Sequence, residues 1–249
     1  MIFHYLKIAF RNLCKHKTQN IISIIGLAVG LLCFCVCIYC SRFVESTDHC
    51  FANHDRIAEL NLYDGKADRY FSGSPVPLAE ELRTWALGET EAISSVTYPR
   101  ERPYYVELSP EKTLPYELET IEIDTCYNKI FTPEMVAGHW KMASQSLNSV
   151  ILSQSMAIKI FGNAESAIGK HMTLMRRLNT SPESTPKTGG IVYIIQAVMK
   201  DIPLNNSLDF MQNIDMLTVN DSEGLLQSPK RHNMTGANTY VLLSPQTTC

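Results

Sequence analysis

The feature that most constrains this chain is a predominantly apolar stretch of 20 residues near its N-terminus, residues 21–40. The stretch contains no charged residue and no proline. Twenty helical residues at about 1.5 Å each reach roughly 30 Å, which is the thickness of the hydrocarbon core of a bilayer. The sequence therefore predicts one transmembrane helix over residues 21–40.

A cleaved secretory signal is the main alternative for such a stretch. The apolar part of a signal peptide usually has about 7–15 residues and is followed by a small-x-small cleavage site, which this sequence lacks. A lipoprotein signal also fits poorly, because it needs a small residue before its cysteine. Larger residues precede the cysteines of this stretch: Leu32, Phe34, Val36 and Tyr39. These observations favour an uncleaved span.

Basic residues cluster on the N-terminal side of the predicted span. Residues 1–20 hold four of them and no acidic residue, whereas the rest of the chain holds 18 basic and 25 acidic residues. An excess of Lys and Arg marks the cytoplasmic side of a span. We therefore expect a cytoplasmic N-terminus and an extracytoplasmic region from about residue 45 onward. The same distribution argues against nucleic-acid binding, which needs basic residues spread over a folded face.

Residues 1–20 have the pattern of an amphipathic helix. One face carries the apolar residues Ile2, Leu6, Ala9 and Leu13. The basic residues, the first three of them at i, i+4 spacing on another face, are Lys7, Arg11, Lys15 and Lys17. This pattern predicts a cytoplasmic amphipathic helix that lies on the anionic membrane surface, with lipid as its partner. An ordinary positive flank of the span is the alternative.

Gly26 and Gly30 form a G-x-x-x-G motif within the predicted span. Two glycines on one helix face let a neighbouring helix approach closely, so the motif predicts a helix-packing face, although it also occurs by chance in apolar helices. The cysteines indicate no disulfide scaffold. Five of the eight lie in or beside the span, and the three that remain outside are an odd number.

Residues 45–249 mix the signals of strands and helices. A hairpin is expected over residues 56–71, with its turn at Asp64-Gly65. Pro75 and Pro77 precede an amphipathic helix over residues 78–87. Further strands are expected at 93–98, 104–108 and 117–124.

The clearest local unit lies in residues 149–162. A short apolar strand at 149–153 leads into a helix at 154–161, which Gly162 ends. A strand at 171–176, a polar loop at 179–190 and strands at 191–199 and 240–243 follow. The predicted fold class is therefore α+β with a mixed sheet. Its core should include Val150, Ile151, Ile158, Phe161, Ile194 and Val198.

The sequence contains no nucleophile elbow, P-loop, GxGxxG or HExxH motif. His49, Cys50 and His54 could be zinc ligands by residue type, but their spacing matches no standard zinc site. A polar collar between the span and the domain is the favoured interpretation. We therefore expect no enzyme activity, no catalytic residue, no cofactor and no metal.

Four segments of the chain carry a resemblance to a known family. They are residues 6–17 leading into 24–31, residues 48–57, residues 138–140 with 149–162 and 168–170, and residues 198–203 with Asn206 and Ser207. In this order they are similar to the opening helix, first span and periplasmic domain of bacterial ABC-transporter permeases of the MacB/FtsX-like type. The resemblance covers almost the whole chain.

The resemblance implies a single-pass protein of the bacterial inner membrane with a MacB-like periplasmic core domain over residues 45–249. It also implies a homo- or heterodimer of permeases, paired with a cytoplasmic ABC ATPase whose ATP hydrolysis moves the periplasmic domains. Exported or extracted cargo in this family includes antibiotics, peptides and lipoproteins. The ATP chemistry would belong to the partner, because this chain has no nucleotide motif.

The chain departs from the family in one respect. The family has three further spans after the periplasmic domain, whereas this sequence ends at Cys249 without a second long apolar stretch. We therefore expect an N-terminal fragment or a truncated product. Two other function classes stay open: a single-span, membrane-anchored periplasmic sensor or binding module and, with less support, a membrane-anchored periplasmic enzyme.

Overall fold

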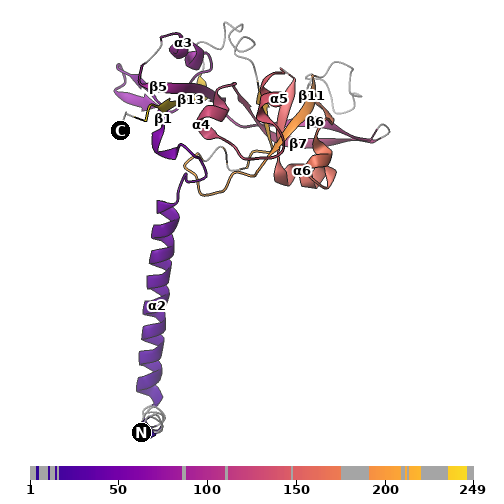
Figure 1. Cartoon of the computed structure of the whole chain (residues 1–249). Helices are drawn as coiled ribbons and strands as arrows, with labels where there is room; N and C mark the ends of the chain where they lie inside the picture. The colour runs from indigo at the N-terminus through magenta and orange to yellow at the C-terminus, as the bar shows by residue number, and fades with distance from the viewer. Residues whose placement is uncertain are drawn as a thin grey trace. The chain divides into compact units, whose positions relative to one another are not determined.

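The computed structural model describes residues 4, 5, 11, 15, 17–85, 88–109, 112–146, 148–174, 191–208, 211, 213–219 and 235–245. The chain divides into two compact units, Met1–Thr47 and Asp48–Cys249 (Figure 1). Several predictions fall outside the described residues: Lys7 and most of the amphipathic helix, the end of the helix at 78–87, and the polar loop at 179–190.

The first unit contains the helix α2 (Lys17–Glu45), which has 29 residues and buries none of them. Its length and composition suffice to cross a membrane. The helix therefore contains the whole predicted span and continues beyond it at both ends. Backbone hydrogen bonds within the helix explain how so apolar a segment can remain regular without neighbours.

The second unit is built on a mixed sheet of eleven strands among the described residues. The strands are β1 (Ile57–Leu60), β4 (Ser74–Pro75), β5 (Thr90–Thr97), β6 (Arg100–Ser109), β7 (Lys112–Ile123), β8 (Met135–Gly138), β9 (Ser149–Ser153), β10 (His171–Leu174), β11 (Val192–Met199), β12 (Met216–Val219) and β13 (Thr235–Leu243). The helices are α3 (Leu78–Thr84), α4 (Tyr127–Phe131), α5 (Trp140–Ser144) and α6 (Gln154–Phe161), with the 3-10 turns η1 (His54–Arg56) and η2 (Glu165–Ala167). The α+β class predicted from the sequence is confirmed.

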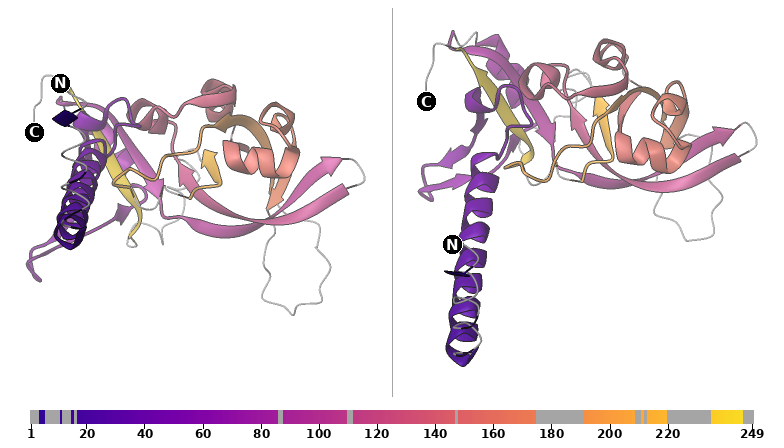
Figure 2. Two further views of the ribbon diagram at one scale, coloured as in Figure 1. Left: turned by 90° about the horizontal axis from the view of Figure 1, so that it is seen from below. Right: turned by 60° about the horizontal axis from the view of Figure 1, so that its bottom comes forward.

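The strand order is β1-β13-β5-β7-β12-β9-β11-β10-β6, with β4 on β13 and β8 on β11. Because β6 also pairs with β7, six strands from β7 to β6 form a closed circuit. Figure 2 shows the long pink β6–β7 hairpin extending away from the rest of this unit. Pairing at both ends of the circuit leaves few exposed strand edges there, which limits unwanted pairing with other chains.

Two apolar cores lie on opposite faces of the sheet. On one face α6 covers residues such as Val150, Leu152 and Ile195. On the other face α4, α5 and the segment after α2 cover Ile151 and Tyr240, among others. Strand β9 contributes to both cores, since successive side chains of a strand point to opposite faces. This explains why all five of its residues are buried.

The core prediction is correct in part. Val150, Ile151 and Val198 are fully buried. Ile194 and Phe161 are only half-buried, and Ile158 is 49% exposed, so these assignments were wrong. In α6 the face toward the sheet carries Met156, Ala157 and Ile160, and Ile158 lies off that face. In β11 the buried set is Tyr193, Ile195, Ala197, Val198 and Met199, with an irregularity in its pairing between Ile195 and Ala197.

The predicted hairpin also differs from the observed one. Strands β2 (Leu62–Asp64) and β3 (Arg69–Phe71) form a separate two-stranded sheet, whereas β1 pairs with β13. The turn is wider than a two-residue Asp-Gly turn. Its reason is local: the Asp64 carboxylate accepts hydrogen bonds from the backbone N–H groups of Lys66 (2.9 Å) and Ala67 (3.3 Å).

Candidate functional site

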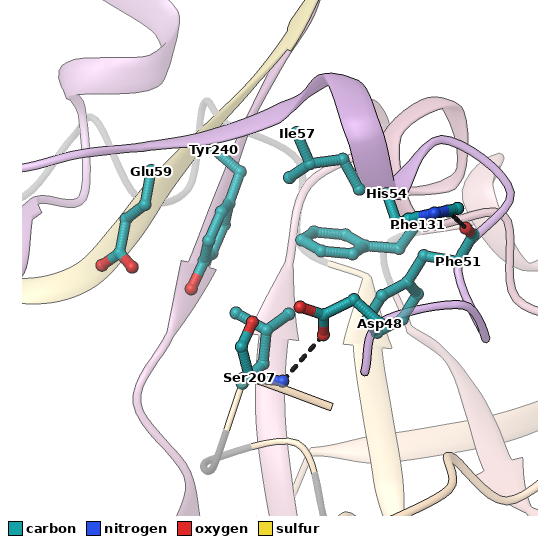
Figure 3. A pocket seen from close by; sticks show the side chains of 9 residues that line it. Asp48, Phe51, His54, Ile57, Glu59, Phe131, Ser207 and Tyr240 are labelled. Carbon is teal, nitrogen blue, oxygen red and sulfur yellow. Dashed lines mark hydrogen bonds between the residues drawn. The ribbon is translucent and has the colours of Figure 1, made fainter. Parts of the chain in front are cut away.

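A pocket lies where the segment after α2 meets β1, α4 and β13 (Figure 3). We call residues 48–56 the junction segment, because they are the part of the domain that follows α2 in the chain. The cavity has a volume of about 110 Å³ and all of its lining belongs to the second unit. The lining residues are Asp48, Phe51, His54, Ile57, Glu59, Phe131, Ser207, Leu208 and Tyr240.

Asp48 fixes the start of the junction segment. Its backbone N–H donates to the carbonyl of Asn205 (3.2 Å), and its carboxylate accepts from the backbone N–H of Ser207 (2.7 Å). Its φ of +65° lies in the left-handed region, which Asp tolerates better than most residues. Asn206 stabilises the segment that Asp48 contacts. Its side chain donates to Pro203 O (2.6 Å) and accepts from Leu208 N (2.9 Å). The first residue of the domain is therefore held at two points.

The rest of the junction segment is tied to distant parts of the domain. The Asn53 side chain donates to the carbonyls of Lys129 (3.1 Å) and Ile130 (3.4 Å) in α4. The Arg56 guanidinium donates to the carbonyl of Leu243 in β13 (2.9 Å). Phe51 is buried with its ring centroid 5.3 Å from that of Phe131. Hydrogen bonds and apolar contacts thus attach this segment firmly to the sheet.

Glu59 and Tyr240 form one wall of the pocket. They are direct partners in the β1–β13 pairing, so their side chains project on the same face. Figure 3 shows the Glu59 carboxylate and the Tyr240 hydroxyl pointing the same way. The Glu59 side chain is exposed in part, and the partial burial of its carboxylate raises its pKa. Burial also raises the pKa of Tyr240, whose hydroxyl accepts from Asn238 Nδ2 (3.2 Å).

Aromatic rings form the floor. The Phe131 ring stands edge-on to Tyr240 with the centroids 5.2 Å apart, and Tyr127 lies behind it at 4.8 Å. Edge-to-face aromatic contacts of this kind stabilise a core beyond the area that they bury. The pocket therefore combines rigid aromatic walls with two carboxylates.

The polar residues considered as zinc ligands lie close to this pocket without forming a ligand set. The rings of His49 and His54 are 4.5 Å apart, and His54 Nε2 lies 3.1 Å from Asp55. Within the described parts of the chain, no three His, Cys, Asp or Glu side chains gather in a way that could hold a metal ion.

The sequence-predicted sites in the first unit are exposed. Arg11, Lys15 and Lys17 are solvent-exposed. An added Cβ at Gly26 or Gly30 would meet no described atom within 4 Å, so none of the described residues covers the G-x-x-x-G face. The helix-packing and membrane-surface roles of these residues stay predictions.

The domain is similar to solved structures of transporter domains. One is a domain of a permease protein from Porphyromonas gingivalis, with a TM-score of 0.59, 21% identity and coverage of 79% of each chain. Another is the periplasmic region of MacB from Actinobacillus actinomycetemcomitans, with a TM-score of 0.51, 14% identity and coverage of 82% of this chain and 81% of that one. No protein-family model and no curated protein matches the sequence.

These likenesses define the class of the domain. It shares its fold with that permease domain and with the periplasmic region of MacB. More particularly, it has the MacB-like periplasmic core fold, as the sequence motifs predicted. Together with a helix able to cross a membrane, this fold fits a single-pass protein with an extracytoplasmic domain.

Sequence reasoning missed the pocket. Its motifs included Asp48 and Ser207, which the structure joins by a hydrogen bond. It did not bring these residues together with Glu59, Phe131 and Tyr240. Only the pairing register of β1 and β13 places Glu59 beside Tyr240, and no local signal in the sequence encodes that register.

Proposed function

We propose that this chain forms part of the membrane-spanning permease component of an ABC transporter. In this proposal a partner ATPase in the cytoplasm drives a conformational change of the extracytoplasmic domain, which exports or extracts cargo. The observation that carries the proposal is the MacB-like fold of the domain directly after an apolar helix. The N-terminus would be cytoplasmic and the domain would lie outside the inner membrane, in keeping with the positive-inside rule.

The short connection between helix and domain supports a mechanical role. Helix α2 ends at Glu45, and Asp48 is already held by two hydrogen bonds to the segment 205–207. In this proposal a pull on the helix is transmitted to the domain through the two residues that connect them, Ser46 and Thr47. Two permease chains would assemble as a homo- or heterodimer, with Gly26 and Gly30 as the proposed packing face.

Purification of the tagged full-length chain from its native membranes in a mild detergent tests this proposal. We expect an ABC ATPase in amounts close to one per permease chain, with ATP hydrolysis in the purified sample. A matched sample carries a flexible Gly-Ser spacer between Thr47 and Asp48. The spacer should keep the ATPase bound but abolish any nucleotide-dependent change in the protease sensitivity of the domain. A chain that carries no ATPase, or an unaltered nucleotide response with the spacer, would contradict the proposal.

The pocket favours a second candidate function, that of a membrane-anchored sensor or binding module. Its lining combines aromatic and acidic side chains in a cavity, which is the composition of many small-ligand sites. A binding module would need no ATPase, so the purification above separates the two candidates.

A further inference from the structure

We infer that the pocket at the junction segment binds a small organic cation, an ammonium group that carries apolar substituents. This inference does not depend on the transport proposal, because it concerns only the chemistry of the cavity. It rests on the size of the cavity, its uncompensated carboxylates and its aromatic walls.

The cavity admits a group of a few heavy atoms. Its volume of about 110 Å³ exceeds the roughly 10–15 Å³ that a single water needs and is below the roughly 150 Å³ of a cavity that holds benzene. Figure 3 shows side chains from the junction segment, β1, α4, β13 and residue 207 converging on this space. A small ligand would therefore touch five separate parts of the chain.

The carboxylates of Asp48 and Glu59 set the charge of the ligand. Asp48 accepts a hydrogen bond from Ser207 N (2.7 Å). Glu59 has no hydrogen-bond or ion-pair partner in the described part of the chain, and neither carboxylate is paired there with a Lys or Arg side chain. The lining contains no Lys or Arg either. An anion would be repelled, and a neutral ligand would remove water from the carboxylates without compensation, at a cost in free energy.

The aromatic rings distinguish an organic cation from a metal ion. Phe51, Phe131 and Tyr240 line the cavity, and aromatic rings attract a cation that also has apolar surface. A metal ion would need a set of three or more ligand side chains, and the described residues contain no such group.

Binding of choline to the full-length chain in a maltoside detergent, measured by calorimetry at constant ionic strength, tests the inference. The matched ligand is 3,3-dimethyl-1-butanol, which replaces the nitrogen of choline by carbon and so removes only the charge. We expect choline to bind and its carbon analogue to bind at least about tenfold more weakly, since each tenfold corresponds to about 1.4 kcal/mol.

Two substitutions locate the binding. Glu59→Gln keeps the shape of an exposed side chain and should weaken choline binding about fivefold, the upper range for an exposed charge pair. Glu101→Gln removes the same charge from an exposed position outside the pocket and should change nothing. Should Glu59→Gln lower the melting temperature, Asp48→Asn replaces it, because an amide oxygen can still accept from Ser207 N.

Three results would overturn the inference. Equal binding of choline and its carbon analogue would mean that the cavity recognises shape without charge. Equal weakening by Glu59→Gln and Glu101→Gln would mean that choline responds to overall charge. Absence of choline binding through the millimolar range would mean that the pocket holds no such cation. None of these results bears on the ATPase association described above, so the two proposals fail separately.

Discussion

Helix α2 and strand β9 are both apolar, yet their surroundings are opposite. In α2 the side chains of Leu27 and Phe34 are 68% and 62% exposed, and no residue of the helix is buried. In β9 the side chains of Val150, Ile151 and Leu152 are completely buried between two apolar cores. The domain therefore supplies the apolar surroundings of β9, whereas the described residues supply none to α2.

The difference follows from backbone hydrogen bonding. A strand must pair with its neighbours, so the five residues of β9 gain apolar cover from the sheet that forms around them. A helix satisfies its own backbone groups and can remain alone, provided that its surroundings are apolar. An apolar stretch therefore indicates a domain core when it forms a strand, and a membrane span when it forms a long helix without neighbours.

Replacement of both Leu27 and Leu31 by Arg should have the largest effect, because it makes the surface of α2 polar where the account requires apolar surroundings. Each Arg near the centre of a span costs about 2.5–3.5 kcal/mol of insertion free energy. We expect the double variant to leave the membrane fraction after an alkaline wash. Leu152→Ala in β9 is the control, since it should destabilise the domain by about 2–5 kcal/mol and leave membrane association unchanged. A membrane-bound double Arg variant would show that α2 is not a span.

Asp124 provides the next largest expected effect. It is 4% exposed and contacts the Arg83 guanidinium, while its carboxylate also accepts from Ser94 Oγ (2.7 Å), Ser95 N (2.9 Å) and Cys126 N (3.0 Å). Asp124→Ala should lower the free energy of unfolding by about 3–5 kcal/mol, because it leaves Arg83 and buried donors unpaired.

The matched control is the exposed pair between Glu134 and Lys200 (2.9 Å). Glu134→Ala should change stability by less than about 1 kcal/mol. Urea unfolding of both variants measures the difference. Similar losses of unfolding free energy in the two would mean that burial does not determine how much an ion pair stabilises this domain.

Replacement of one glycine in the domain and one in α2 by Ala should affect domain stability differently. Gly138 has a φ of +72°, and a Cβ there would clash with the backbone of Gln196 in β11. Gly138→Ala should therefore cost about 1–3 kcal/mol of domain stability. Gly30→Ala has no such clash and should leave domain stability unchanged. Cross-linking within the membrane then reports on packing: a reduced dimer yield for Gly30→Ala supports the packing face, and an unchanged yield argues against it.

Alkaline pH should lower the free energy of unfolding of the domain, because it ionises a buried tyrosine. Burial raises the pKa of Tyr104 to about 12. Since its pKa is higher in the folded state than in the unfolded state, its stabilisation is complete below about pH 10 and is lost as the pH rises toward 12, a loss of about 2 kcal/mol at pH 12.

Denaturant midpoints measured across this range, with tyrosinate absorbance as a second readout, check the prediction. Tyr104→Phe should make the decline shallower, because Phe cannot ionise. An equal decline in this variant would assign the loss to other groups.

Local signals predicted some elements well. The unit of β9 and α6 has the bounds predicted from the sequence, because Ser153 caps the helix by accepting from Met156 N and Gly162 ends it in the left-handed region. Signals that depend on distant partners were missed. Strand β12 is short and was not predicted, although it joins β7 to β9.

The same limit applies to the pocket and to the core of β11. Glu59 and Tyr240 come together through strand register, and the buried face of β11 changes at an irregularity in its pairing with β9. Neither is encoded within one segment, so composition and periodicity could not give them.

The side of the membrane on which the domain lies tests the central claim most directly. An alkaline phosphatase fused to the C-terminus of the full-length chain is active only outside the cytoplasm, and a fluorescent protein that folds only in the cytoplasm is the complementary fusion. The account predicts high phosphatase activity, no fluorescence, and mixed signals when Lys7, Arg11, Lys15 and Lys17 are replaced by Gln. Bright fluorescence with no phosphatase activity for the unaltered chain would place the domain in the cytoplasm and contradict it.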